Sequence, residues 1–137
     1  MHLTARRGNP ELFNFFISKG VSANQIDTNG NIALINAAAG SKENLEKILA
    51  NSNNITHQNQ IGKSAITIAI ERGKKENFYF LLSQRADLNI KDTLGNNLMY
   101  YVFESHNSKK KEVTQHFISQ LSLRGLDGKK HMKMKTL

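Results

Sequence analysis

The sequence contains no cysteine and no tryptophan among its 137 residues. Without cysteine there can be no disulfide framework, no thiolate metal site and no cysteine nucleophile. No stretch approaches the roughly 18 consecutive apolar residues that a membrane-spanning helix needs. Arg6 and Arg7 interrupt the N-terminal segment where a signal peptide would have its apolar core. We therefore expect a soluble protein.

The formal net charge of +8 is unevenly distributed along the chain. Residues 1–108 carry eleven basic and nine acidic side chains, whereas residues 109–137 carry eight basic and two acidic ones. Basic residues of this kind could bind nucleic acid or anionic lipid, although residues 123–137 contain no aromatic side chain on which bases would stack. The alternative is a solvated, flexible terminus. The lysines concerned are Lys109, Lys110, Lys111, Lys129 and Lys130.

Three segments of the chain share one layout, with an acid or amide, a glycine and a run of small and apolar residues at matching offsets. Their glycines, Gly30, Gly62 and Gly95, stand 32 and 33 residues apart. A fixed period of this size predicts stacked structural repeats. The segments are DTNGNIALINAAAG at 27–40, NQIGKSAITIAIERG at 59–73 and DTLGNNLMYYVFESH at 92–106.

Residues 59–91 form the clearest repeating unit. Gly62 allows the positive φ that a tight turn needs. Residues 64–73 are short, small and apolar, which favours a helix packed between two neighbours, and residues 74–84 have apolar positions at helical spacing. Asn89 is placed to hydrogen-bond the turn that follows. Neither helix can bury its apolar face alone, so such units must stack.

These features resemble the ankyrin repeat family over about residues 1–120. The matching residues are Asp27, Gly30, Leu34, Ala37, Ala38, Gly40, Glu43, Gly62, Ile66, Ala69, Gly73, Glu76, Ala86, Asp87, Asn89, Asp92 and Gly95. The resemblance implies an all-α solenoid of about three to four helix-turn-helix repeats, of which the first is incomplete. The expected units are 1–26, 27–58, 59–91 and 92–123, followed by a basic, flexible tail at 124–137.

The chain also departs from the family pattern. Its Thr-Pro-Leu-His slot lacks proline and histidine in all three units, at 32–35, 64–67 and 97–100. We therefore expect a stack less stable than idealised arrays. Because the sequence starts inside a repeat, we expect a fragment of a longer protein, with a shortened N-terminal cap as the alternative. An atypical last helix near 112–123 is expected to end the stack.

The resemblance implies a protein-binding module that recognises a partner on the concave surface of hairpin tips and inner helices. Ile61 and Leu94 occupy equivalent tip positions and would anchor the partner, although single exposed apolar residues are ordinary. We expect a monomer. The predicted partner-binding residues are Arg7, Asn29, Asn31, Ile61, Lys63, Arg72, Leu94 and Asn96.

No catalytic, cofactor-binding or metal-binding residues are predicted. The Gly62-Lys63-Ser64 sequence matches the end of a phosphate-binding loop, but His57 stands where that motif needs a glycine. The five histidines are scattered and form no metal-ligand pattern. We therefore expect no enzymatic activity.

The resemblance carries two further expectations. The context of Asn89 resembles sites that an asparaginyl hydroxylase modifies in ankyrin repeats of animal cells. Intracellular bacteria also use ankyrin proteins as effectors directed at their hosts. The expected localisation is therefore cytoplasmic, or secreted into a host cell if the protein is such an effector.

Overall fold

The computed structural model describes residues 10–20, 22, 24–51, 54–104 and 111–125. Within these ranges the protein is helical and contains no strand, as the all-α prediction requires. The helices are α2 (Pro10–Ser18), α3 (Ala33–Ala37), α4 (Lys42–Leu49), α5 (Ala65–Glu71), α6 (Lys75–Ser83), α7 (Leu98–Glu104) and α8 (Lys111–Leu123).

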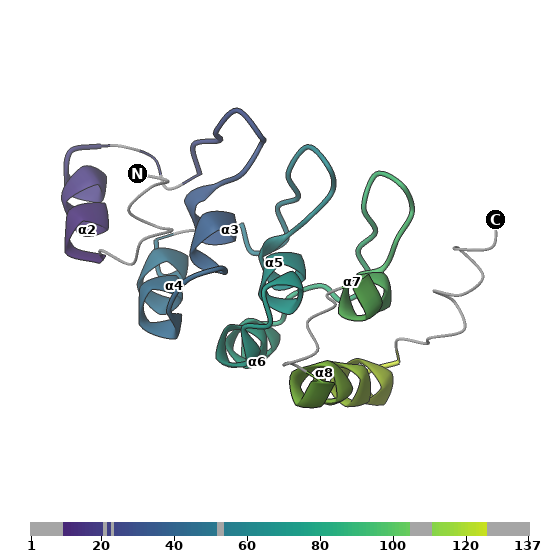
Figure 1. The fold of residues 1–137 in the computed structure, drawn as a ribbon. Helices are drawn as coiled ribbons and strands as arrows, with labels where there is room; N and C mark the ends of the chain where they lie inside the picture. Colours follow the sequence, from purple (N-terminus) through teal and green to yellow (C-terminus); the bar gives the residue numbers. More distant parts are fainter. Residues whose placement is uncertain (1–9, 21, 23, 52–53, 105–110, 126–137) are drawn as a thin grey trace.

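The helices form two layers (Figure 1). Helices α3, α5 and α7 lie side by side in an inner layer, and α4, α6 and α8 lie in an outer layer. Each inner helix contacts the outer helix that follows it in sequence, and α5 contacts both α3 and α7. Three hairpin loops project from the same edge of the inner layer. This arrangement is the solenoid that the repeat period predicts.

A single apolar core runs between the layers. The inner helices contribute mainly small or β-branched residues, which let neighbouring helices approach closely, and the outer helices contribute larger ones. Each fully buried aliphatic or aromatic side chain stabilises the fold by about 1.5–3 kcal/mol. The core includes Ala33, Leu34, Ala37, Ala65, Ile66, Ala69, Leu98, Met99 and Val102 from the inner layer, and Leu45, Ile48, Phe78, Leu81, Phe117 and Leu121 from the outer layer.

The hairpins share one hydrogen-bonding scheme; hairpin 1 comprises residues 27–31, hairpin 2 residues 59–63 and hairpin 3 residues 92–96. In each, the side-chain Oδ1 of the first residue accepts the backbone N–H groups two and four positions later. The bonds run to Asp27 from Asn29 and Asn31 at 2.8 and 2.9 Å, to Asn59 from Ile61 and Lys63 at 3.1 and 2.9 Å, and to Asp92 from Leu94 and Asn96 at 2.9 and 2.8 Å.

Neighbouring hairpins are joined through their backbones. The N–H of Gln60 donates to the carbonyl of Asn29 at 3.0 Å, and the N–H of Thr93 donates to the carbonyl of Ile61 at 3.1 Å. Gly62 lies at the second junction with φ of +88°, and a Cβ there would stand 2.5 Å from the Asp92 Cα. Glycine is therefore required at this position both by its conformation and by the approach of the next hairpin.

A buried amide joins the two helix layers. Asn77 on α6 is 2% exposed, and its Nδ2 donates to the carbonyls of Ala38 and Gly40, each at 2.9 Å. These carbonyls follow α3, where the last turn of a helix leaves its acceptors unpaired. Asn77, on the outer helix of one repeat, thus donates hydrogen bonds to carbonyl groups that follow the inner helix of the preceding repeat.

The contact between α6 and α8 is aromatic. The rings of Phe78 and Phe117 meet edge to face with centroids 4.8 Å apart, and the Tyr79 hydroxyl hydrogen-bonds the Nε2 of His116. Burial lowers the pKa of His116, and the positive charge of Lys75 lowers it further. The last helix, predicted near 112–123, begins one residue earlier and packs against the stack through this cluster.

Replacing Gly62 with alanine should destabilise the fold more than replacing Gly20. Both glycines have a positive φ, which costs about 1–2 kcal/mol for a residue with a Cβ. The overlap with hairpin 3 adds about 1–3 kcal/mol at Gly62 alone, because no described atom lies within 4 Å of a Cβ at Gly20. Urea denaturation followed by circular dichroism measures both free energies of unfolding. Equal losses would show that the close approach of the hairpins does not constrain the stack.

Replacing Asn77 with alanine should lower the free energy of unfolding by about 1–3 kcal/mol, because the buried carbonyl of Ala38 and the partly buried carbonyl of Gly40 lose their donor. Asn51 is the matched control, since its Nδ2 donates to the Lys47 carbonyl at 3.1 Å on the exposed surface. The Asn51→Ala variant should change stability by less than about 0.5 kcal/mol. The same urea titrations measure both variants, and an Asn77→Ala protein as stable as the wild type would contradict the assigned role.

Candidate functional site

Two grooves lie in the angle between the hairpins and the inner helices. Groove A, of about 390 Å³, lies between hairpins 1 and 2, and groove B, of about 350 Å³, lies between hairpins 2 and 3. They share Ile61, Lys63 and Glu71, so together they form one continuous surface. Groove A is lined by Asp27, Asn29, Asn31, Ile35, Asn36, Ala39, Asn59, Gln60, Ile61, Lys63, Ile68, Glu71 and Arg72. Groove B is lined by Ile61, Lys63, Glu71, Asp92, Thr93, Leu94, Asn96, Tyr100, Tyr101 and Glu104.

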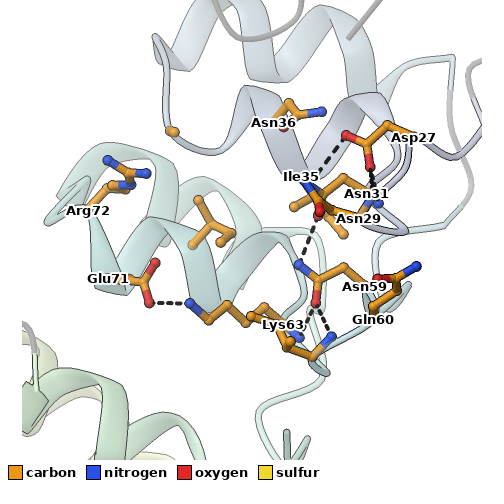
Figure 2. Close-up of a pocket in the computed structure, with 13 residues that line it drawn as sticks. Asp27, Asn29, Asn31, Ile35, Asn36, Asn59, Gln60, Lys63, Glu71 and Arg72 are labelled. Atoms are coloured by element: carbon orange, nitrogen blue, oxygen red, sulfur yellow. Dashed lines mark hydrogen bonds and ion pairs between the residues drawn. The ribbon is translucent and has the colours of Figure 1, made fainter. Parts of the chain in front are cut away.

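Groove A is rich in side-chain amides (Figure 2). Asn29 and Asn31 come from hairpin 1, Asn59 and Gln60 from hairpin 2, and Asn36 from α3. The Nδ2 of Asn59 donates to the Oδ1 of Asn31 at 2.9 Å and bridges the two hairpins. Because Asn59 is an amide and not an acid, it organises its own hairpin and still has a donor for its neighbour.

Lys63 lies between the two grooves and is bonded within the chain. Its Nζ is 2.6 Å from the Oε2 of Glu71 and 5.4 Å from the centroid of the Tyr101 ring. The Lys63 side chain is only 18% exposed. The ammonium group therefore connects hairpin 2 to α5 and α7, and much of its charge is balanced before any partner binds.

In groove B, Asp92 and Tyr101 form a hydrogen-bonded pair. The Tyr101 hydroxyl donates to the Oδ2 of Asp92. Partial burial alone would raise the pKa of Asp92, but hydrogen bonds from Tyr101, Asn96 and Leu94 hold it below its usual range. Burial raises the pKa of Tyr101, and the Asp92 carboxylate beside it raises it further. At neutral pH the pair is thus a carboxylate and a neutral phenol.

The aliphatic residues predicted at the hairpin tips are exposed. Ile61 is 52% exposed where the two grooves meet, and Leu94 is 83% exposed at the rim of groove B. Asn29 is exposed on hairpin 1, and Arg72 lines groove A at the end of α5. Arg7 lies outside the described residues.

Two of the predicted asparagines make bonds within their hairpins. The Nδ2 of Asn31 lies 3.5 Å from the Oδ2 of Asp27, and the Nδ2 of Asn96 donates to the Oδ2 of Asp92 at 3.1 Å. Their side chains, like that of Lys63, help to hold the surface in shape.

Sequence reasoning missed four inner-helix residues that line the grooves. Ile35 and Ile68 line groove A, and Tyr100 and Tyr101 line groove B. Their apolar character places them in the core when the sequence is read alone. The available signal was their register, since Ile68 and Tyr101 stand 33 residues apart on successive inner helices.

The other sequence predictions fall elsewhere. Asn89 is exposed, and the bond observed there is donated by its backbone N–H to the Oδ1 of Asp87 at 2.9 Å, not by its side chain. Lys111 begins α8, whereas Lys109, Lys110, Lys129 and Lys130 lie outside the described residues.

Within the described part of the chain, no three or more histidine, aspartate or glutamate side chains are grouped so that they could hold a metal ion. None of the helices described is long and apolar enough to cross a membrane.

Comparison with known proteins agrees with the geometry. The chain is 25% identical over 124 residues to alpha-latroinsectotoxin-Lt1a of Latrodectus tredecimguttatus, an alignment that covers 88% of this chain. It spans only 9% of the length of that toxin. The family model described as ankyrin repeats, in three copies, matches residues 1–92. With hairpins, paired helices and sequence pattern in agreement, the chain belongs to the ankyrin repeat family.

Proposed function

We propose that this protein binds a partner protein on the surface formed by grooves A and B and the exposed hairpin tips. The observation that supports this most is the pair Ile61 and Leu94, which are 52% and 83% exposed on successive hairpins. They border grooves with a combined apolar and polar lining. Interfaces of this kind gain most of their energy from a few side chains that become fully desolvated.

The rigidity of the hairpins supports the proposal. The backbone bonds between neighbouring hairpins and the bridge from Asn59 to Asn31 hold the tips at a fixed spacing. A surface that is already ordered loses little conformational entropy when a partner binds. The tip side chains would therefore convert contact area into affinity more effectively than the same residues on loose loops.

The family match supports a protein partner in general terms, and binding in grooves A and B is our proposal. A host-directed role and hydroxylation of Asn89 remain predictions from the resemblance, because neither the grooves nor the family match bears on them. The toxin relative is a much longer protein, so its whole activity gives no assignment for this chain.

Electrostatic attachment to nucleic acid or anionic membrane is the second candidate. The observation that favours it is the positive charge of residues 109–137, which carry eight basic and two acidic side chains. Such binding would weaken steeply as salt rises, because it depends on the release of counterions. It would not require the hairpin tips.

The double variant Ile61→Ser, Leu94→Ser should lose a protein that the wild type retains from cell lysate at moderate salt. Two hot-spot aliphatics together contribute about 2–4 kcal/mol to binding, enough to remove a micromolar partner from a pull-down. Leu123→Ser is the matched control, since Leu123 is 75% exposed at the end of α8 and lies outside both grooves. Circular dichroism checks that all three proteins are folded.

A protein retained equally by the wild type and the double variant would contradict the proposed surface. Nucleic acid or lipid retained by all three proteins and released by salt would assign the binding to the basic C-terminal segment. In that case the hairpin tips would have no part in it.

A further inference from the structure

Groove B is more acidic than groove A, although the chain as a whole is strongly basic. The charged residues lining groove B are Glu71, Asp92, Glu104 and Lys63, which leave a formal charge of −2. The charged residues lining groove A are Asp27, Glu71, Lys63 and Arg72, which balance to zero. On a protein of net charge +8, groove B is therefore a local region of opposite sign.

The formal charge of −2 already includes Lys63, the one lysine in the lining of groove B. Its ammonium group is paired with Glu71 at 2.6 Å and lies over the Tyr101 ring. Asp92 is held ionised by its hydrogen bonds to hairpin 3 and Tyr101. The negative charge of Asp92 thus remains inside the groove. Glu104 also lines the groove, and it ends α7 as Glu71 ends α5 one repeat earlier.

The same groove has an apolar rim and an aromatic wall. Leu94 is 83% exposed and Ile61 is 52% exposed, one from each hairpin that borders the groove. Tyr100 is half-buried, and its ring meets that of Tyr101 edge to face with centroids 5.3 Å apart. Tyrosine rings attract cations placed over their faces, most strongly the planar guanidinium of arginine.

From this combination we infer that groove B takes a segment of a partner protein in which an aliphatic side chain is next to an arginine or lysine. The aliphatic side chain would pack against Leu94 and Ile61. The cationic group would lie toward Glu104 and Glu71, over the Tyr100 ring. This inference rests on the proposed function, because it specifies the partner for one part of the same surface.

The physical basis is charge complementarity in a partly enclosed site. A groove of about 350 Å³ accommodates one or two side chains but not a folded domain. Carboxylates in such a site are less screened than on an open surface, so a cation there forms strong charge-assisted hydrogen bonds. A partner segment with acidic residues would be repelled by the same groups.

The test uses the full chain labelled with 15N and capped hexapeptides of alternating leucine and arginine. The arginine peptide should shift the backbone amide resonances of Thr93, Leu94 and Asn96. The same peptide with neutral citrulline in place of arginine should bind at least about tenfold more weakly, as expected when a charge-assisted hydrogen bond is lost. A leucine and glutamate peptide should cause no shift at these positions.

Two matched variants locate the charge. Glu104→Gln should weaken the arginine peptide by about threefold to tenfold and leave the citrulline peptide unchanged. Glu43→Gln removes a carboxylate from the exposed face of α4, where it pairs with Lys47 at 3.4 Å, and should leave both peptides unchanged.

Any one of three results would overturn the inference. The arginine and citrulline peptides could bind equally well, the two variants could have equal effects, or the shifts could be confined to the outer helices. If Ile61→Ser, Leu94→Ser still abolishes capture of a protein partner while the charge of the peptide has no effect, the proposed function stands and only the inference falls. If the double variant still captures the protein partner, and the peptides cause no shift at Thr93, Leu94 or Asn96, both the proposed function and the inference are overturned.

Discussion

The architecture depends on how closely the backbones of successive hairpins approach each other. The bond from Thr93 to the Ile61 carbonyl requires hairpin 3 to lie directly against Gly62, where any Cβ would meet the Asp92 backbone. Because the hairpins are fixed at this spacing, the inner helices below them are spaced in the same way. Grooves A and B are the spaces that this arrangement leaves on one side of the stack.

Several polar side chains of the groove surface maintain its shape. Four of them make hydrogen bonds or ion pairs within one repeat or to a neighbouring repeat, namely Asn31, Asn59, Lys63 and Asn96. The exposed aliphatic residues at the tips are different, since their side chains contribute little to the fold. Substitutions of Ile61 and Leu94 should therefore cost little stability, because neither of these exposed side chains makes the bonds that order the surface.

The repeat fold was predictable because its requirements are local and recur. A glycine with positive φ, an acid or amide three residues before it and a short apolar helix after it are visible in sequence at each repeat. The exposure of Ile61 and Leu94 also follows from register, since both precede the turn glycine. The inner-helix residues that line the grooves are harder to identify from sequence, because Ile68 and Tyr101 lie on helices whose other side chains are mostly buried, and only their 33-residue spacing marks them.

The sequence by itself determined the period, the helix pairs and the residues at the hairpin tips, because each depends on contacts among residues close together in the chain. The tertiary structure decided which side chains meet across repeats. Asn77 reaches the Ala38 carbonyl 39 residues earlier, and Lys63 of hairpin 2 lies over Tyr101 of α7. These contacts depend on the distance and angle between stacked helices. That geometry results from the packing of the whole core and is not encoded in any single repeat.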